Sequence, residues 1–119
     1  MDWQAIYEHL KQGGFDVYPL GQHRGECKKP YIVLRNNGCT RPGALELGLY
    51  ELLLYYPLDR YSQFEDFIRD VETHMNKLFP AAKLVDGPSI HYLDESVQGY
   101  MTSLTYQCPQ VTHLNEITN

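Results

Sequence analysis

Residues 62–80 read SQFEDFIRDVETHMNKLFP, and their apolar side chains recur at intervals of three and four. This spacing places them on one face of an α-helix, with charged side chains on the opposite face. Ser62 and Glu65 have the spacing of a capping box at the helix start, and Pro80 marks its end. The stretch therefore predicts a long helix that covers a sheet through Phe64, Phe67, Ile68, Val71, Met75 and Leu78.

The segment before this helix, residues 47–56, is a nearly continuous apolar run. A run of this length permits either a buried strand or a helix. Gly48, the tyrosines of the run and the turn-forming residues before it favour a strand. Residues 31–34 are β-branched and aromatic, which predicts another strand, and Asn36-Asn37-Gly38 predicts a turn directly after it.

The N-terminal segment has the features of a short helix. Asp2 is a favourable N-cap, and Gly13-Gly14 supplies the conformational freedom that ends a helix. The apolar stripe of this helix consists of Trp3, Ile6, Tyr7 and Leu10. Further strands are expected at residues 15–18, 89–93 and 100–106.

These elements predict an α+β fold: one mostly antiparallel or mixed sheet of about five strands, packed by two helices in the order α-β-β-β-α-β-β. With 119 residues the chain has the usual size of one domain. We expect that domain to span residues 1–108, and residues 109–119 to form a loose tail, because they are polar and unpatterned.

Composition and charge narrow the possible functions. The net charge of -5 has the wrong sign for an obligate nucleic-acid binder. The sequence shows no signal peptide and no apolar stretch long enough to span a bilayer, so no membrane role is expected. The three cysteines are an odd number, widely spaced and without a CxxC motif, which indicates free thiols in a reducing compartment. Ten tyrosines favour protein–protein contact and oligomerisation.

No catalytic or cofactor motif stands out. The sequence lacks a GxSxG elbow and a phosphate-binding loop, and the neighbours Asp94 and Glu95 point apart. We therefore expect no catalytic residue, no cofactor and no metal. One alternative stays open, an enzyme that binds zinc through His23, Cys27 and Cys39, although the tight ligand pair of most zinc sites is missing.

Three blocks of sequence resemble a known family. The first comprises residues 14–18 (GFDVY), 21–27 (GQHRGEC) and 30–33 (PYIV). The second is residues 56–62 (YPLDRYS), and the third is Pro88-Ser89 with residues 94–101 (DESVQGYM). In this order and spacing, from about Gly14 to Tyr106, the chain resembles the tail terminator proteins of long-tailed bacteriophages and of prophages of Gram-positive bacteria. These are also called tail completion or minor capsid proteins.

The resemblance implies a structural role in the virion and no catalytic residues. Such proteins assemble in the host cytoplasm into a homo-oligomeric ring, usually a hexamer, on the head-proximal end of the tail tube. The ring stops polymerisation of the tail tube protein and offers a docking face to the head completion or connector protein. DNA passes through its lumen without specific binding. The associated fold is an α/β sandwich with one sheet and two helices.

A ring requires two different patches of one subunit to meet on neighbours. Basic side chains on the loops at residues 20–29 and 36–46, and acidic ones around residues 86–95, predict such patches. The expected contact residues are Arg24, Glu26, Lys28, Lys29, Arg35, Arg41, Glu46, Asp94 and Glu95. A different reading is a small cytosolic ferredoxin-like binding module that dimerises through its sheet.

Overall fold

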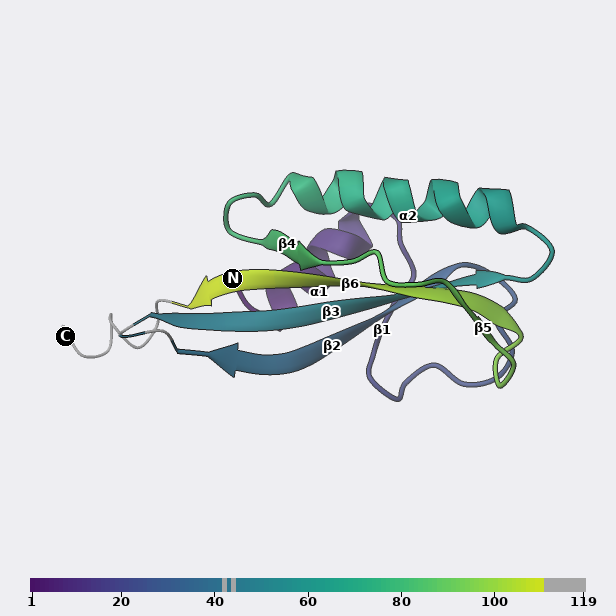
Figure 1. The fold of residues 1–119 in the computed structure, drawn as a ribbon, viewed down its shortest axis with the longest axis horizontal. Coiled ribbons are helices and arrows are strands. Elements are labelled where there is room, and N and C mark those ends of the chain that lie inside the picture. Colours follow the sequence, from purple (N-terminus) through teal and green to yellow (C-terminus); the bar gives the residue numbers. More distant parts are fainter. Residues whose placement is uncertain (42, 44, 111–119) are drawn as a thin grey trace.

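The computed structural model describes residues 1–41, 43 and 45–110, and this part of the chain forms two helices and six strands (Figure 1). The predicted α+β class and the order of its elements are confirmed. The elements are α1 (Trp3–Gln12), β1 (Val17–Pro19), β2 (Tyr31–Thr40), β3 (Glu46–Pro57), α2 (Tyr61–Asn76), β4 (Lys83–Asp86), β5 (Tyr92–Asp94) and β6 (Gly99–Gln110).

The strands form one mixed sheet in the order β1-β2-β3-β6-β4, within the described residues. The edge strand β1 pairs with β2 in parallel, and the other pairs are antiparallel. β4 and β5 pair one after the other with the same strand, β6, so together they form the second edge of the sheet. The choice of a strand for residues 47–56 is confirmed, because this run forms the central strand β3.

Both helices pack against one face of the sheet. Ile6 and Leu10 of α1 belong to the same buried cluster as Leu52 and Leu54 of β3. The predicted stripe of α2 supplies Phe64, Ile68, Val71 and Met75 to that cluster, and Phe67 and Leu78 pack against its border. Fully burying an apolar side chain of this size contributes about 1.5–3 kcal/mol, so the four buried residues of α2 contribute substantially to the stability of the domain. Figure 1 shows α2 running along the length of the sheet.

Two local predictions were wrong. β2 continues through Asn36-Asn37-Gly38, because a β-bulge between Asn36 and Cys39 absorbs the residues expected to turn the chain. Gly38 adopts a φ of 88°, and its N–H donates to Asn36 Oδ1, so the turn chemistry is present inside the strand. The capping box does not form either, since α2 begins at Tyr61 and its described N-cap, Arg60, makes no side-chain capping bond.

The C-terminal half contains one strand more than expected. β4 was not predicted, and the strand expected at residues 89–93 begins only at Tyr92. β6 continues through Gln110, two residues past the predicted domain boundary. Residues 111–119 of the expected tail lie outside the described part of the chain.

Candidate interaction surfaces

The second face of the sheet is not covered by either described helix. Leu47, Leu49 and Leu53 of the central strand β3 point to this helix-free face and are partly exposed. One-sided antiparallel sheets normally carry polar side chains on their open face. Leu53 packs against the buried cluster of Cys27, Tyr31 and Val33, so Leu47 and Leu49 are left on the open part of this face, as is typical of a surface that contacts another protein.

The loop between β1 and β2 covers one end of the helix-free face. His23 stacks on Tyr31 with 3.6 Å between ring centroids, and Tyr31 stacks on Tyr55 at 4.7 Å. The backbone N–H of Cys27 donates to the carbonyl of Val97 at 2.6 Å, which joins this loop to the β5–β6 turn. The loop is therefore built into the domain by packing and a hydrogen bond.

The thiols and phenols of this region are not activated. Burial raises the pKa of the Cys27 thiol to about 11, and burial likewise raises the pKa of Tyr31 and of Tyr55. These groups stay protonated at neutral pH, and a protonated thiol is a poor nucleophile and metal ligand.

The structure separates the three residues of the zinc alternative. Cys27 is buried, and its thiol contacts the carbonyl of Lys29, whereas Cys39 is exposed near the far end of β2. From Tyr31, which His23 contacts, to Cys39 is roughly 25 Å of extended chain. Among the described residues, no group of three His, Cys, Asp or Glu side chains is placed to bind a metal.

Eight of the nine predicted contact residues fall into two groups. Arg24, Glu26, Lys28 and Lys29 lie on the β1–β2 loop, which meets the β5–β6 turn that begins at Asp94 and Glu95. Arg41 and Glu46 lie at the tip of the β2–β3 hairpin, and Arg35 lies on β2 between the groups. The molecule measures 54 × 26 × 25 Å, and the loop and the hairpin tip lie toward opposite ends of it (Figure 1).

Three of the predicted basic residues form ion pairs within the chain. Lys29 lies 3.6 Å from Asp16, Arg35 lies 2.7 Å from Glu51, and Arg41 lies 3.5 Å from Glu46. Their charges are therefore partly neutralised before any partner arrives. Arg24 and Lys28 form no ion pair within the described residues, which makes them the stronger candidates for contact with another molecule.

The second edge of the sheet carries exposed apolar side chains that the sequence did not single out as contact residues. Val85 is 45% exposed, Ile90 78%, Tyr92 53% and Leu93 55%. We call these four residues the apolar edge. Sequence periodicity did not reveal it, because a short alternating segment looks the same whether it lies in the middle of a sheet or at its border.

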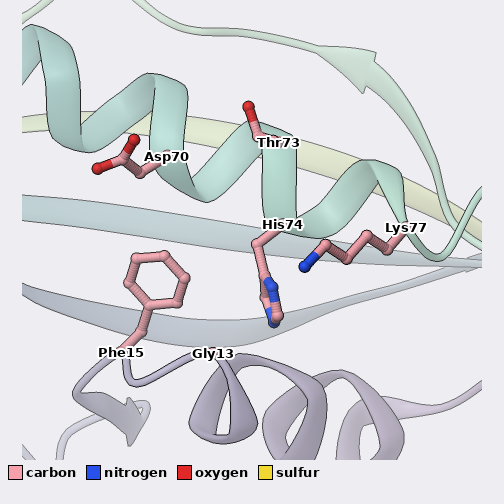
Figure 2. A pocket seen from close by; sticks show the side chains of 6 residues that line it. All are labelled: Gly13, Phe15, Asp70, Thr73, His74 and Lys77. Atoms are coloured by element: carbon pink, nitrogen blue, oxygen red, sulfur yellow. The ribbon is translucent and has the colours of Figure 1, made fainter.

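An open depression of about 400 Å³ lies where the ends of the two helices meet (Figure 2). Its lining comprises Gly13, Phe15, Asp70, Thr73, His74 and Lys77. His74 stacks on His9 with 3.9 Å between ring centroids, and each ring bonds the other residue's backbone carbonyl, at 2.6 and 2.8 Å. The two imidazole groups join α1 to α2, so this depression is a structural junction between the helices.

Compared with protein-family models and with curated proteins, the chain matches none of them. Within the described residues, no helix is long and apolar enough to cross a membrane.

Proposed function

We propose that this protein is a phage tail terminator, which forms a ring on the head-proximal end of the tail tube and joins the tail to the head connector. The observation that carries this proposal is that the three resembling sequence blocks meet in the fold, through the Cys27–Val97 hydrogen bond and the pairing of Tyr56 with Tyr100, and the partly exposed Leu47 and Leu49 add a surface for contact with another protein. The three sequence blocks support it, because they resemble those of a family whose members act through contacts with copies of themselves and with other virion proteins.

The parts of the fold that correspond to those blocks lie at one end of the molecule. Gly21–Cys27 forms the loop that packs on Tyr31, and residues 94–101 form the turn that this loop contacts through Cys27 and Val97. The block at residues 56–62 leads from β3 into α2. The resembling residues therefore build one contiguous region, as expected of a shared docking surface.

Deletion tests the proposal directly. A phage that encodes this chain, with the reading frame removed, is expected to produce full heads beside unjoined tails of excessive and irregular length. Electron microscopy of negatively stained lysates measures this, and a plasmid copy of the gene restores normal particles. Tails of normal length joined to heads in the deletion strain would contradict the proposal.

A charge reversal at the hairpin tip tests the second group of predicted contact residues, Arg41 and Glu46, with the protein intact. Arg41→Glu is expected to impair ring formation and plasmid rescue while the subunit stays folded, because Arg41 is 65% exposed. Arg69→Glu is the matched control, since Arg69 also forms an exposed ion pair, with Asp66, but on the outer side of α2. Equal rescue by both variants would show that the hairpin tip takes no part in assembly.

A binding module that dimerises through its sheet is a second candidate. The leucines of the helix-free face favour it, because two such faces packed together would bury them. Light scattering coupled to size-exclusion chromatography separates the candidates. A strict dimer that loses its association on Leu49→Asp supports the module, and a ring supports the terminator.

A further inference from the structure

The apolar edge exposes large hydrophobic side chains to solvent. Its four members, Val85, Ile90, Tyr92 and Leu93, lie within nine consecutive residues and are each 45% exposed or more. Scattered apolar residues are normal on a protein surface, but three large exposed ones within four consecutive residues, Ile90, Tyr92 and Leu93, are typical of an interaction site, and Val85 lies farther along the same edge.

Hydrogen bonds on both sides hold Ile90 in its exposed position. The backbone N–H of Ser89 donates to the carbonyl of Ser103 at 3.0 Å, and the Ser89 hydroxyl lies 3.1 Å from that of Thr102. On the other side the His91 ring lies 2.5 Å from the Tyr61 hydroxyl. Ile90 therefore lies between two residues that are hydrogen-bonded to the rest of the domain, Ser89 and His91, and a preordered contact residue loses little conformational entropy on binding.

The edge is apolar on both faces of the sheet. Tyr92 lies opposite Met101, on the helix-free face, and Leu93 lies opposite Tyr100, on the helix-covered face. Natural sheets protect an open edge with charged side chains, proline or a cover. This edge has charged residues and a proline, at Lys83, Asp86, Pro88 and Asp94, but Tyr92 and Leu93 also place large apolar groups above and below its backbone, which suits it to receive a neighbouring protein.

The same chain carries a surface of matching chemistry on the β1–β2 loop, which begins after the other edge strand, β1, and reaches the β5–β6 turn through the Cys27–Val97 hydrogen bond. Leu20 is 61% exposed directly after β1, and the loop behind it carries three basic residues and one acidic residue between positions 20 and 29. Residues 83–95, around the apolar edge, carry three acidic residues and one lysine. Each surface thus combines an apolar contact with charge of the sign opposite to that of the other.

We propose that the apolar edge of one subunit binds the β1–β2 loop of a second copy of this chain, with Ile90 and Leu93 against Leu20, and Arg24 facing the acidic residues. This contact joins unlike surfaces, and its repetition builds a ring where the rotation from one subunit to the next closes, and an open filament where it does not. The inference rests on the proposed function, to which it adds the pair of surfaces that subunits use.

Two variants of the full-length protein test it, each altering one surface. Ile90→Asp changes the apolar edge, and the double change Leu20→Asp with Arg24→Glu alters the loop. Sedimentation velocity over a concentration series is expected to show self-association of the unchanged protein that each variant weakens by about tenfold or more. Phe79→Asp is the matched control, because Phe79 is 64% exposed outside the apolar edge, and it is expected to associate normally.

Mixing the two variants gives the decisive measurement. Each variant retains one intact surface, so an equimolar mixture is expected to form a one-to-one complex and nothing larger. Far-ultraviolet circular dichroism confirms that both variants are folded. The proposal is overturned if the mixture stays monomeric, if the loop variant associates as well as the unchanged protein, or if the unchanged protein stays monomeric up to its solubility limit.

The result is independent of the deletion experiment. Abnormal tails in the deletion strain, with no complex between the variants, would contradict this contact and support the terminator function. Normal tails, with a complex that forms as described, would contradict the terminator function and support this contact.

Discussion

Tyr106 is buried in the core, yet its hydroxyl has no hydrogen-bond partner among the described residues. Burial raises its pKa, and the nearby Glu72 carboxylate acts in the same direction. A buried hydroxyl without a partner has lost its bonds to water and gained nothing in return. Tyr18 is the natural comparison, because its hydroxyl donates to Asp16 Oδ2 at 3.0 Å.

Replacing each of the two tyrosines by phenylalanine is expected to change the free energy of unfolding in opposite directions. Tyr106→Phe is expected to leave the free energy of unfolding unchanged or to raise it by up to about 1 kcal/mol, because it removes an unsatisfied group. Tyr18→Phe is expected to lower it by up to about 1 kcal/mol, because it removes a formed bond. Urea unfolding measures both, and a loss at Tyr106 as large as that at Tyr18 would reveal an additional partner.

At the scale of elements, the two helix starts differ in how they are capped. Asp2 Oδ1 accepts from the backbone N–H of Ala5 at 2.9 Å, whereas the described start of α2 has no side-chain cap. Asp2→Ala is therefore expected to lower the free energy of unfolding by about 1 kcal/mol. Ser62→Ala is expected to change it by less than about 0.5 kcal/mol. Thermal unfolding compares them, and equal losses would mean that Ser62 does cap α2.

The junction between the helices depends on the absence of a side chain at Gly13. A Cβ there would lie 2.6 Å from His74 Nε2 and within 3 Å of two ring carbons. Because φ of Gly13 is -77°, alanine meets no backbone strain, and the effect is steric. Gly13→Ala is expected to lower the free energy of unfolding by about 1–3 kcal/mol. In a His74→Ala background the same change is expected to cost much less, and an unchanged penalty would contradict this account.

Periodicity predicted the elements that have a clear inside and outside. The apolar stripe of α2 and every second side chain along most of β6 face the core, so the sequence pattern agrees with the burial. β4 was missed because it has four mostly exposed residues and hence no burial pattern to read. Asn36-Asn37-Gly38 was misplaced because a bulge and a turn use the same residue types, and only pairing with β3 separates them.

The contact residues were harder to predict, because charge says nothing about internal partners. Arg35 looked available in the sequence, but the register of β2 and β3 places it directly opposite Glu51. The position of β5 at an open edge, which exposes Ile90 and Leu93, depends on pairing with β6. Register and strand order are long-range properties, so single-sequence reasoning could not tell which charged residues are paired within the chain or which apolar residues lie at an open edge.

For the whole molecule, buried thiols and phenols predict loss of stability at alkaline pH. Burial raises the pKa of Cys27 from its ordinary value of 9.0 to about 11, and also raises the pKa of Tyr31 and Tyr106. The unfolded chain releases these protons first, so the stability is fully present below pH 9 and falls as the pH rises toward 11.

Urea unfolding at a series of pH values measures this fall, to which Cys27 is expected to contribute about 1–2 kcal/mol. Cys27→Ala is expected to flatten the curve between pH 9 and 11. Cys39→Ala, which changes an exposed thiol, is expected to leave its shape unchanged. A curve that is flat up to pH 11 in the unchanged protein would show that Cys27 reaches solvent.

The paired histidines between α1 and α2 also fix the position of two protons. His9 Nε2 and His74 Nε2 each face a backbone carbonyl oxygen, and a carbonyl oxygen only accepts. Both rings must therefore carry hydrogen on Nε2, which selects one tautomer for each neutral imidazole. Nitrogen-15 NMR of the folded protein should show two such rings whose Nε2 protons exchange slowly with water, and the free-solution mixture of tautomers should return only when the helices separate.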